Sequence, residues 1–356
     1  MNQYHFGEVR AAVLTIWVLA ILLAVFFGIA GAPVAFSGEN GKLTGGMAHS
    51  YPDWFKESFL DFKEDASESA AEGKHTILFM SLNGCPYCAR MLSETFVEDR
   101  ALMEKDFDTI GLNIRGDRMV SRDGETEISE KQLARQMHVR FTPTTVFLDE
   151  TAKIVFRING YWDPAQFRTA LAFVRSKSYQ SMSISEFSKS RKQEKIWDFR
   201  AHSLLSQRTD FSDPAKPLLV LFEDAGCSAC AELHDKMLAR EDVRTVLKTY
   251  DFVRLDARSN AAIVDNEGNG TTMEKWAAKL GVSTAPTFIA FDEGEERQRF
   301  DGLLYSHHFV SILAYVSGKH YLNYDNWLQY NSKRTREVLA SGKDIDLSDG
   351  TSKAQE

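Results

Sequence analysis

Two short motifs, Cys-Pro-Tyr-Cys at 85–88 and Cys-Ser-Ala-Cys at 227–230, hold all four cysteines of this 356-residue chain. Each follows an apolar run that predicts a buried strand and opens a pattern that predicts a helix. A cysteine in the first turn of a helix has its thiolate stabilised by unpaired backbone N–H groups and by the helix dipole. A second cysteine three residues later shares its face and can resolve a mixed disulfide. We therefore expect two redox dithiols, with Cys85 and Cys227 attacking and Cys88 and Cys230 resolving.

Two other roles for these cysteines are weighed against the redox role. A zinc ion needs four ligands, which two Cys-X-X-Cys pairs could supply in principle, but each pair lies inside its own complete repeat. A purely structural disulfide is the second alternative, and a bridge that closes so small a loop restrains the unfolded chain little. We favour the redox role and expect neither a metal nor a cofactor beyond the two redox-active disulfides.

Composition limits the class of protein. The length favours two domains, and an apolar content of 44% is ordinary for globular proteins. The net charge is −8 and no block of Lys and Arg stands out, so we expect no nucleic-acid partner.

The N-terminal segment differs from the rest of the chain, because residues 11–30 contain no charged side chain. Twenty helical residues span about 30 Å, the thickness of a bilayer core. We expect a membrane anchor within 1–36 and a Gly-rich, flexible tether over 37–49; a cleaved signal peptide is the alternative. Arg10 precedes the span, which favours a body outside the cytoplasm. The expected location is periplasmic, anchored to the inner membrane, or soluble in the periplasm after cleavage.

The remaining chain is an internal repeat. A shift of 142 residues superposes the two cysteine motifs and places Gly160 on Gly302, and a shift of 143 places Pro143 on Pro286. We assign one unit to 50–190 and a second to 191–333, followed by a polar tail at 334–356 that we expect to be disordered. The pattern of the first unit predicts helix, strand, helix, strand, helix, strand, strand and helix. The polar insertions at 115–130 and 258–271 are expected to be loops.

This order of elements, with a proline 58 or 59 residues after the first cysteine, resembles the thioredoxin fold. The resemblance implies an α/β protein with two tandem thioredoxin-like domains, each a central mixed sheet flanked by helices. These domains would follow the N-terminal transmembrane helix that residues 11–30 predict. It also implies cis peptide bonds before Pro143 and Pro286, in loops that face the cysteines and present backbone to an extended substrate. The implied substrate-binding residues are Pro86, Tyr87, Thr142, Pro143, Ala285 and Pro286.

The segments 84–88, 111–117 and 140–144 resemble more closely the SoxW-like periplasmic thioredoxin-related proteins found with sulfur-oxidation systems. That resemblance implies electron exchange with exported thiol proteins and a membrane thiol transporter as the source of electrons. One departure matters. Cytoplasmic thioredoxin carries a buried aspartate six residues before its first cysteine, where this chain has Phe79 and Leu221. The proton acceptor is therefore unassigned. Glu223, Asp224 or a water molecule could substitute for the aspartate in the second unit, but the two carboxylates are more simply solvated loop charges.

Together these features predict an extracytoplasmic, membrane-tethered thiol-disulfide oxidoreductase that reduces or exchanges disulfides, or sulfur-bearing cysteines, of partner proteins. A disulfide oxidase or isomerase is one alternative. A non-catalytic tethered adaptor that binds client proteins is the other. The adjacent His307 and His308 are expected to be surface and core histidines and not metal ligands.

Overall fold

The computed structural model describes residues 40–191 and 195–349. The expected membrane anchor at 1–36 lies outside them. In the described part of the chain, no helix is long and apolar enough to cross a membrane. Residues from Gly41 onward form one compact unit that contains both repeats.

The first repeat is built on a four-stranded mixed sheet with the strand order β3-β2-β6-β7. The central strand β2 pairs in parallel with β3 and antiparallel with β6, and β7 closes the sheet as the hairpin partner of β6. The strands are β2 (His75–Ser81), β3 (Phe107–Asn113), β6 (Thr144–Leu148) and β7 (Ile154–Asn159). The helices are α2 (Phe62–Ala71), α3 (Pro86–Arg90), a π-helix (Met91–Thr95), α4 (Phe96–Glu98), α5 (Arg100–Asp106), α6 (Glu130–Gln136), α7 (Pro164–Arg175) and α8 (Ile184–Ser190).

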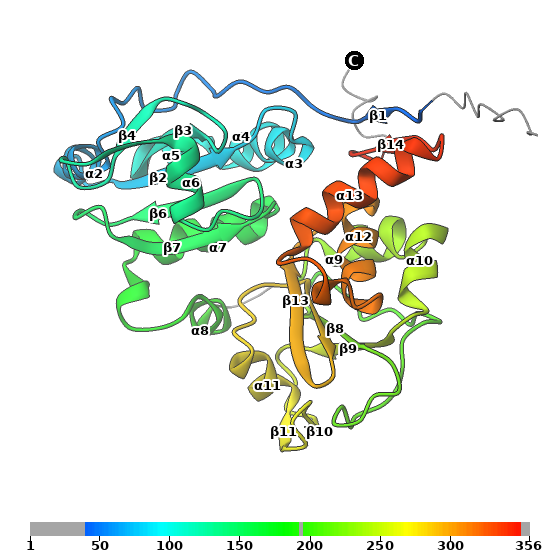
Figure 1. Cartoon of the computed structure of the whole chain (residues 1–356). Coiled ribbons are helices and arrows are strands. Elements are labelled where there is room, and N and C mark those ends of the chain that lie inside the picture. The colour runs from blue at the N-terminus through cyan, green and yellow to red at the C-terminus, as the bar shows by residue number, and fades with distance from the viewer. Residues whose placement is uncertain (1–39, 192–194, 350–356) are drawn as a thin grey trace, which may run out of the picture. The chain divides into compact units, whose positions relative to one another are not determined.

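Strand β2 is uniformly apolar from Ile77 to Met80 because both faces of its sheet are covered (Figure 1). Side chains alternate between the two faces of a strand. Ile77 and Phe79 accordingly join one core cluster, while Leu78 and Met80 join a second one. A strand buried on both faces positions the loop after it rigidly, and in this repeat that loop carries Cys85.

The second repeat has the same topology, with the strand order β13-β12-β8-β9. Its central strand β8 again pairs in parallel with one neighbour and antiparallel with the other. The strands are β8 (Leu218–Glu223), β9 (Asp251–Asp256), β12 (Thr287–Asp292) and β13 (Glu295–Asp301). The helices are α9 (Cys230–Glu232), a π-helix (Leu233–Met237), α10 (Glu241–Leu247), α11 (Met273–Lys279), α12 (Ser306–Ser317) and α13 (Trp327–Ala340).

We had expected the two polar insertions to be simple loops, but they are not. Each contains a short antiparallel hairpin: β4 (Met119–Ser121) pairs with β5 (Glu127–Ser129), and β10 (Ala262–Val264) pairs with β11 (Gly270–Thr272). Strands of three residues are too short for a period-2 pattern to stand out from a polar background.

The expectation of a flexible tether and a disordered tail is wrong for the residues that the structure describes there. Strand β1 (Leu43–Thr44) pairs in parallel with β14 (Ile345–Asp346), which joins the beginning of the described chain to its end. Helix α13 also continues past residue 333, where we had placed the end of the second unit. Otherwise, the domain boundaries assigned from the sequence stay predictions.

Candidate active sites

The first cysteine motif lies where β2 gives way to α3. Cys85 and Cys88 are joined by a disulfide, with their Cα atoms 5.3 Å apart. Cys85 is the N-cap of α3, and its Sγ accepts a hydrogen bond from the backbone N–H of Cys88 at 3.1 Å. Pro86 occupies the first helical position, where the missing N–H has no partner to lose. The same N–H donor stabilises a thiolate on Cys85 once the disulfide is reduced.

The second motif also follows the central strand, β8, but its helix α9 begins only at Cys230, with Ala229 as the N-cap, so Cys227 precedes the helix. Cys227 and Cys230 form a disulfide with a Cα separation of 5.5 Å. Within each motif the first cysteine is the more exposed one: Cys85 is 6% and Cys227 is 4% exposed, whereas Cys88 and Cys230 are 0% exposed. This difference supports the assignment of the first cysteine as the attacking thiol and the second as the resolving thiol.

Both predicted cis-proline loops are present. The peptide bonds Thr142–Pro143 and Ala285–Pro286 are cis, which confirms that prediction. In the first site the Thr142 hydroxyl donates to Cys85 Sγ at 3.4 Å, and the backbone oxygen of Thr142 lies 3.5 Å from the same sulfur. In the second site the equivalent Ala285 has no hydroxyl and packs with both cysteines in one apolar cluster. The sulfurs of the two attacking cysteines, Cys85 and Cys227, therefore have different neighbours.

Tyr87, an expected substrate-binding residue of the first motif, contacts the second repeat. Its hydroxyl oxygen accepts from the backbone N–H of Tyr305 at 2.7 Å and lies 3.0 Å from His308 Nδ1. Burial raises the pKa of Tyr87 well above its usual value, and burial lowers the pKa of His308 to about 3. At neutral pH His308 is uncharged, so the tyrosine hydroxyl can donate its proton to Nδ1. His308 is thus a hydrogen-bond partner of Tyr87.

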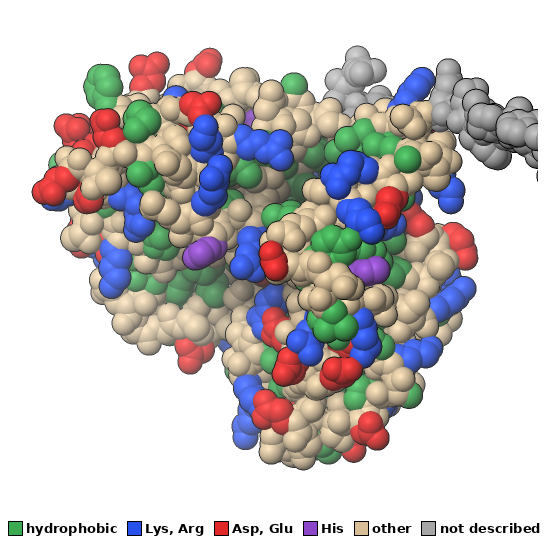
Figure 2. All heavy atoms as spheres, viewed as in Figure 1, with side chains coloured by type: hydrophobic (Ala, Val, Ile, Leu, Met, Phe, Trp, Pro, Cys, Tyr) green, Lys and Arg blue, Asp and Glu red, His purple; other side chains and the backbone are tan. Residues whose placement is uncertain are grey.

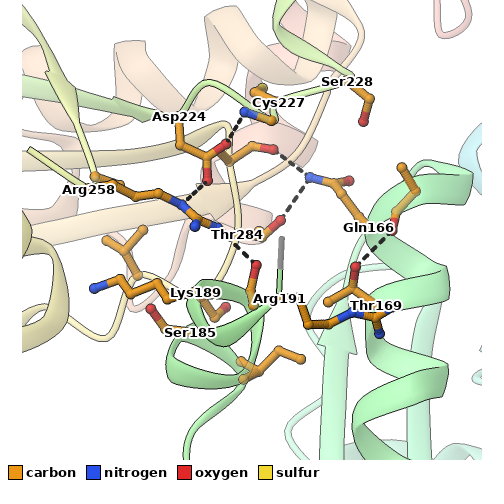
Figure 3. A pocket seen from close by; sticks show the side chains of 18 of the residues that line it. Gln166, Thr169, Ser185, Lys189, Arg191, Asp224, Cys227, Ser228, Arg258 and Thr284 are labelled. Atoms are coloured by element: carbon orange, nitrogen blue, oxygen red, sulfur yellow. Dashed lines mark hydrogen bonds and ion pairs between the residues drawn. The ribbon is translucent and has the colours of Figure 1, made fainter. Parts of the chain in front are cut away.

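The second motif contacts the first repeat in the corresponding way. Ser228 Oγ donates to Asp163 Oδ2 at 2.6 Å, and Asp163 is the N-cap of α7. One turn further along α7, Gln166 Nε2 donates to Thr284 Oγ1 at 2.8 Å and to the backbone oxygen of Ala285 at 2.6 Å (Figure 3). The carbonyl before cis-Pro286, which we expected to be open to an extended substrate, is therefore already hydrogen-bonded.

A pocket of about 330 Å³ adjoins this second site (Figure 3). Cys227 and Ser228 line it together with Gln166 from α7 and Lys189 from α8. Arg258 crosses one side, where its Nε lies 3.2 Å from Asp224 Oδ2 and its guanidinium donates to Ser188 Oγ at 3.2 Å. A substrate could approach Cys227 through this pocket.

The structure shows the burial and the partners of the residues at which a proton acceptor was sought. Phe79 and Leu221, at the position of the thioredoxin aspartate, are buried and apolar. Asp224 pairs with Arg258, but Glu223 is 0% exposed, so its assignment as a solvated loop charge is wrong. In the described ranges no group of three or more His, Cys, Asp or Glu side chains is arranged to hold a metal ion. On the face shown in Figure 2, basic side chains lie among acidic and uncharged ones.

The family model of the thioredoxin-like domain matches the chain twice, over residues 62–175 and 207–317. The chain therefore belongs to the thioredoxin-like domain family and carries two copies of the domain in tandem. Two such domains with paired Cys-X-X-Cys motifs support thiol-disulfide oxidoreductase activity in general. A comparison with curated proteins finds no match.

Similar solved structures include three proteins with the thioredoxin fold or name. A thioredoxin-fold protein from Helicobacter pylori is 24% identical, with 36% of this chain and 92% of that chain covered and a TM-score of 0.29. A thioredoxin from Thermus thermophilus is 24% identical, with 39% and 89% covered and a TM-score of 0.26. An exposed lipoprotein thioredoxin from Streptococcus pneumoniae is 18% identical, with 30% and 88% covered and a TM-score of 0.24.

Sequence reasoning missed the residues through which each repeat covers the other's cysteine motif. Asp163 and Gln166 belong to the segment that begins α7, and Tyr305 and His308 belong to the segment that begins α12. Arg90 of α3 and Glu232 of α9 form an ion pair. One signal was available. Arg90 and Glu232 are opposite charges at equivalent positions of the repeat, as expected of a pair that meets across a two-fold axis.

Proposed function

We propose that this protein is an extracytoplasmic, membrane-tethered thiol-disulfide oxidoreductase that reduces or exchanges disulfides of exported partner proteins. The observation that carries the proposal is that each repeat holds two disulfide-bonded cysteines three residues apart, with a cis-proline loop beside them. This arrangement supplies an attacking thiol, a resolving thiol and a backbone segment for substrate contact.

The mechanism follows from the positions of the two thiols in each motif. In the reduced first site, the Cys85 thiolate attacks one sulfur of a substrate disulfide, and the other substrate sulfur leaves as a thiolate. Cys88 then loses its proton and attacks Cys85 Sγ, which forms the Cys85–Cys88 disulfide and releases the second substrate thiolate. The substrate gains two electrons and the cysteine pair loses two. Cys227 and Cys230 perform the same sequence in the second site.

The location and the biological setting rest on the sequence. The uncharged stretch at 11–30 and the preceding Arg10 support a membrane anchor with the body outside the cytoplasm. The likeness of segments 84–88, 111–117 and 140–144 to SoxW-like proteins supports a link to sulfur oxidation, with sulfur-bearing cysteines among the substrates. A membrane thiol transporter would then supply electrons to the oxidised pairs.

Reduction potentials test the direction of electron flow. Full-length protein in detergent, with one cysteine pair replaced by serine at a time, is equilibrated with thiol buffers, and the reduced fraction is measured by alkylation and mass spectrometry. A reductase predicts at least one pair near the value of thioredoxin, about −270 mV. Values near about −120 mV for both pairs, as in strong disulfide oxidants, would support the oxidase alternative.

Trapping identifies the partners and tests the adaptor alternative. Cys88→Ser and Cys230→Ser leave the attacking thiol without its resolving thiol, so a mixed disulfide with the substrate accumulates. We expect thiol-reversible adducts that disappear when Cys85 or Cys227, respectively, is also replaced by serine. Clients that are retained equally by the double variants, without a covalent bond, would instead indicate a binding protein.

A further inference from the structure

A buried carboxylate and a buried imidazole lie next to the second cysteine pair. Glu223 is the last residue of β8, and its side chain is 0% exposed. His234 Nε2 lies 2.7 Å from Glu223 Oε1, and the His234 side chain is 4% exposed. A buried carboxylate is costly in free energy unless it is paired and hydrogen-bonded, and His234 supplies such a partner for Glu223.

Trp197 connects the pair to the cysteines. Its indole N–H donates to the second oxygen of Glu223, Oε2, at 3.1 Å, and its ring lies 4.9 Å from the His234 ring between centroids. The same tryptophan packs with Cys227 and Cys230 in one apolar cluster. The carboxylate is thus oriented through both oxygens, and one of its two partners packs with the cysteines.

His234 is also close to the resolving cysteine along the chain. Cys230 begins α9, and the helical run continues through the π-helix that contains His234. Residues four apart on a helix share a face, with Cβ atoms about 5–6 Å apart. His234 therefore lies on the helix face of Cys230, and Glu223 holds it from the adjacent strand.

Few other charged groups face the pair. Arg254 Nε lies 4.0 Å from Glu223 Oε2, and the ring of His202 lies 6.3 Å from that of His234. Burial lowers the pKa of His202, which keeps it neutral near pH 7. The Arg200 guanidinium lies 4.9 Å from the centroid of the Trp197 ring and pairs with Asp235. Glu223 and His234 thus form a buried acid–base pair that Trp197 connects to the cluster containing Cys230.

We propose that His234, positioned by Glu223, accepts the proton of the Cys230 thiol during resolution, the role for which the usual aspartate position is occupied by Leu221. This inference rests on the proposed redox function. A hydrogen bond from Nε2–H to Glu223 leaves Nδ1 as the basic nitrogen of His234. Glu223 is a positioning residue that orients the imidazole and stabilises the imidazolium once it forms.

The step balances as follows. After Cys227 has attacked a substrate disulfide, Cys227 Sγ is bonded to a substrate sulfur and Cys230 is a thiol. The Cys230 proton moves to the imidazole, the Cys230 sulfur bonds to Cys227 Sγ, and the bond to the substrate sulfur breaks. The substrate leaves as a thiolate and takes its proton from water. Two cysteine sulfurs are oxidised, and the substrate disulfide is reduced by two electrons.

The first repeat offers an internal comparison. At the repeat shift of 142, Glu223 corresponds to Ser81 and His234 to Leu92. The Ser81 hydroxyl lies 3.2 Å from His49 Nε2 and 2.9 Å from the Tyr51 hydroxyl, so a neutral cluster takes the place of the carboxylate. Resolution by Cys88 should therefore depend on pH differently from resolution by Cys230.

The test follows the two thiols of the second site separately in the full-length protein. Cys85 and Cys88 are replaced by serine, and the reduced protein reacts with 5,5′-dithiobis(2-nitrobenzoate) in a stopped-flow spectrometer. Attack by Cys227 releases one coloured thiolate, and resolution by Cys230 releases a second one. At pH 7 we expect Glu223→Gln to slow the second phase at least about 10-fold, less than the loss of a general base would, because Glu223 acts through His234. We expect the first phase to change much less.

The pH profile separates proton transfer from a structural role. As the pH rises above the ordinary cysteine pKa of about 8.5, hydroxide removes the proton directly, so the variant should approach the parent protein. His234→Gln should behave in the same way, and Glu223→Asp should restore part of the rate at pH 7. The matched control is Asp235→Asn, which removes an exposed carboxylate beside His234 and should leave both phases unchanged.

Two results would overturn the inference. One is an unchanged second phase in both Glu223→Gln and His234→Gln. The other is an equal slowing of both phases at every pH, which would mean a structural role. If the parent protein itself releases no second thiolate, the proposed redox function of this site fails with it, and that outcome is distinct because it appears before any substitution near Glu223.

Discussion

Arg90 and Glu232 form an ion pair at 2.9 Å although they occupy equivalent positions in the two repeats, 142 residues apart. Contact between equivalent residues is the mark of an isologous interface, here between two halves of one chain. The rest of the interface follows the same rule, because each cysteine motif contacts the segment that begins the last sheet-covering helix of the other repeat. Each repeat therefore covers part of the cysteine motif of the other.

Reversal of one charge in this pair should open the contact between the repeats. Both side chains are only partly exposed, so Arg90→Glu should lose an interaction of roughly 1 kcal/mol and add repulsion. We expect faster alkylation of reduced Cys227 by a bulky maleimide, measured by mass spectrometry with the other cysteines replaced by serine. The double variant Arg90→Glu, Glu232→Arg should return to the parent rate. Failure of this rescue would mean that the pair does not hold the interface.

Gln166 should limit access to the second site. Its side-chain amide donates a hydrogen bond to the backbone oxygen of Ala285. Gln166→Ala should therefore free that oxygen for an extended substrate. We expect protein-disulfide reduction by the second site to rise several-fold, with the first site replaced by serine. Ser185→Ala, which also lines the pocket, is the matched control. Equal rates in both variants would show that the carbonyl is not a substrate contact.

The Tyr87 hydroxyl should contribute to stability. Tyr87→Phe leaves the buried N–H of Tyr305 without its partner, which should lower the free energy of unfolding by about 1–3 kcal/mol. Urea unfolding followed by circular dichroism measures this change. Tyr179→Phe is the control, because in the described structure the Tyr179 hydroxyl has no hydrogen-bond partner. A similar loss in both variants would contradict the assigned role of Tyr87.

His308 should make the fold sensitive to acid. Burial lowers its pKa from 6.5 to about 3, so below pH 6.5 the unfolded chain binds a proton that the folded protein does not. Stability is full above pH 6.5 and falls as the pH drops toward about 3. Urea midpoints measured from pH 7 to pH 4 should therefore fall less steeply in His308→Gln than in the parent protein. Parallel curves would exclude His308 as a cause.

Much of the fold could be predicted because it repeats. The duplicated cysteine motifs and prolines predicted two thioredoxin-like domains, and the cis bonds before Pro143 and Pro286 followed from the family resemblance. The short hairpins and the pairing of Leu43 with Ile345 could not be predicted, because contacts of two or three residues leave no periodic pattern. The contact between the repeats could not be predicted either, because it depends on side chains such as Tyr87 that were expected to bind substrate.

Glu223 shows a signal that was present in the sequence. Alternate residues of a strand face the same side, so Glu223 shares the side of Leu219 and Leu221, which belong to one buried cluster. Extension of the strand by one residue would have placed the carboxylate inside. What the sequence could not supply was its partner, because the approach of His234 depends on how the helix after Cys230 packs against the strand.

The most direct test of the central claim is insulin-disulfide reduction by the full-length protein in detergent, with dithiothreitol as the electron source. We expect turnover by the parent protein, reduced turnover in Cys85→Ser and in Cys227→Ser, and no turnover above background when both substitutions are combined. Undiminished turnover in the combined variant, or none in a parent protein whose cysteines are shown to be reduced, would contradict the claim.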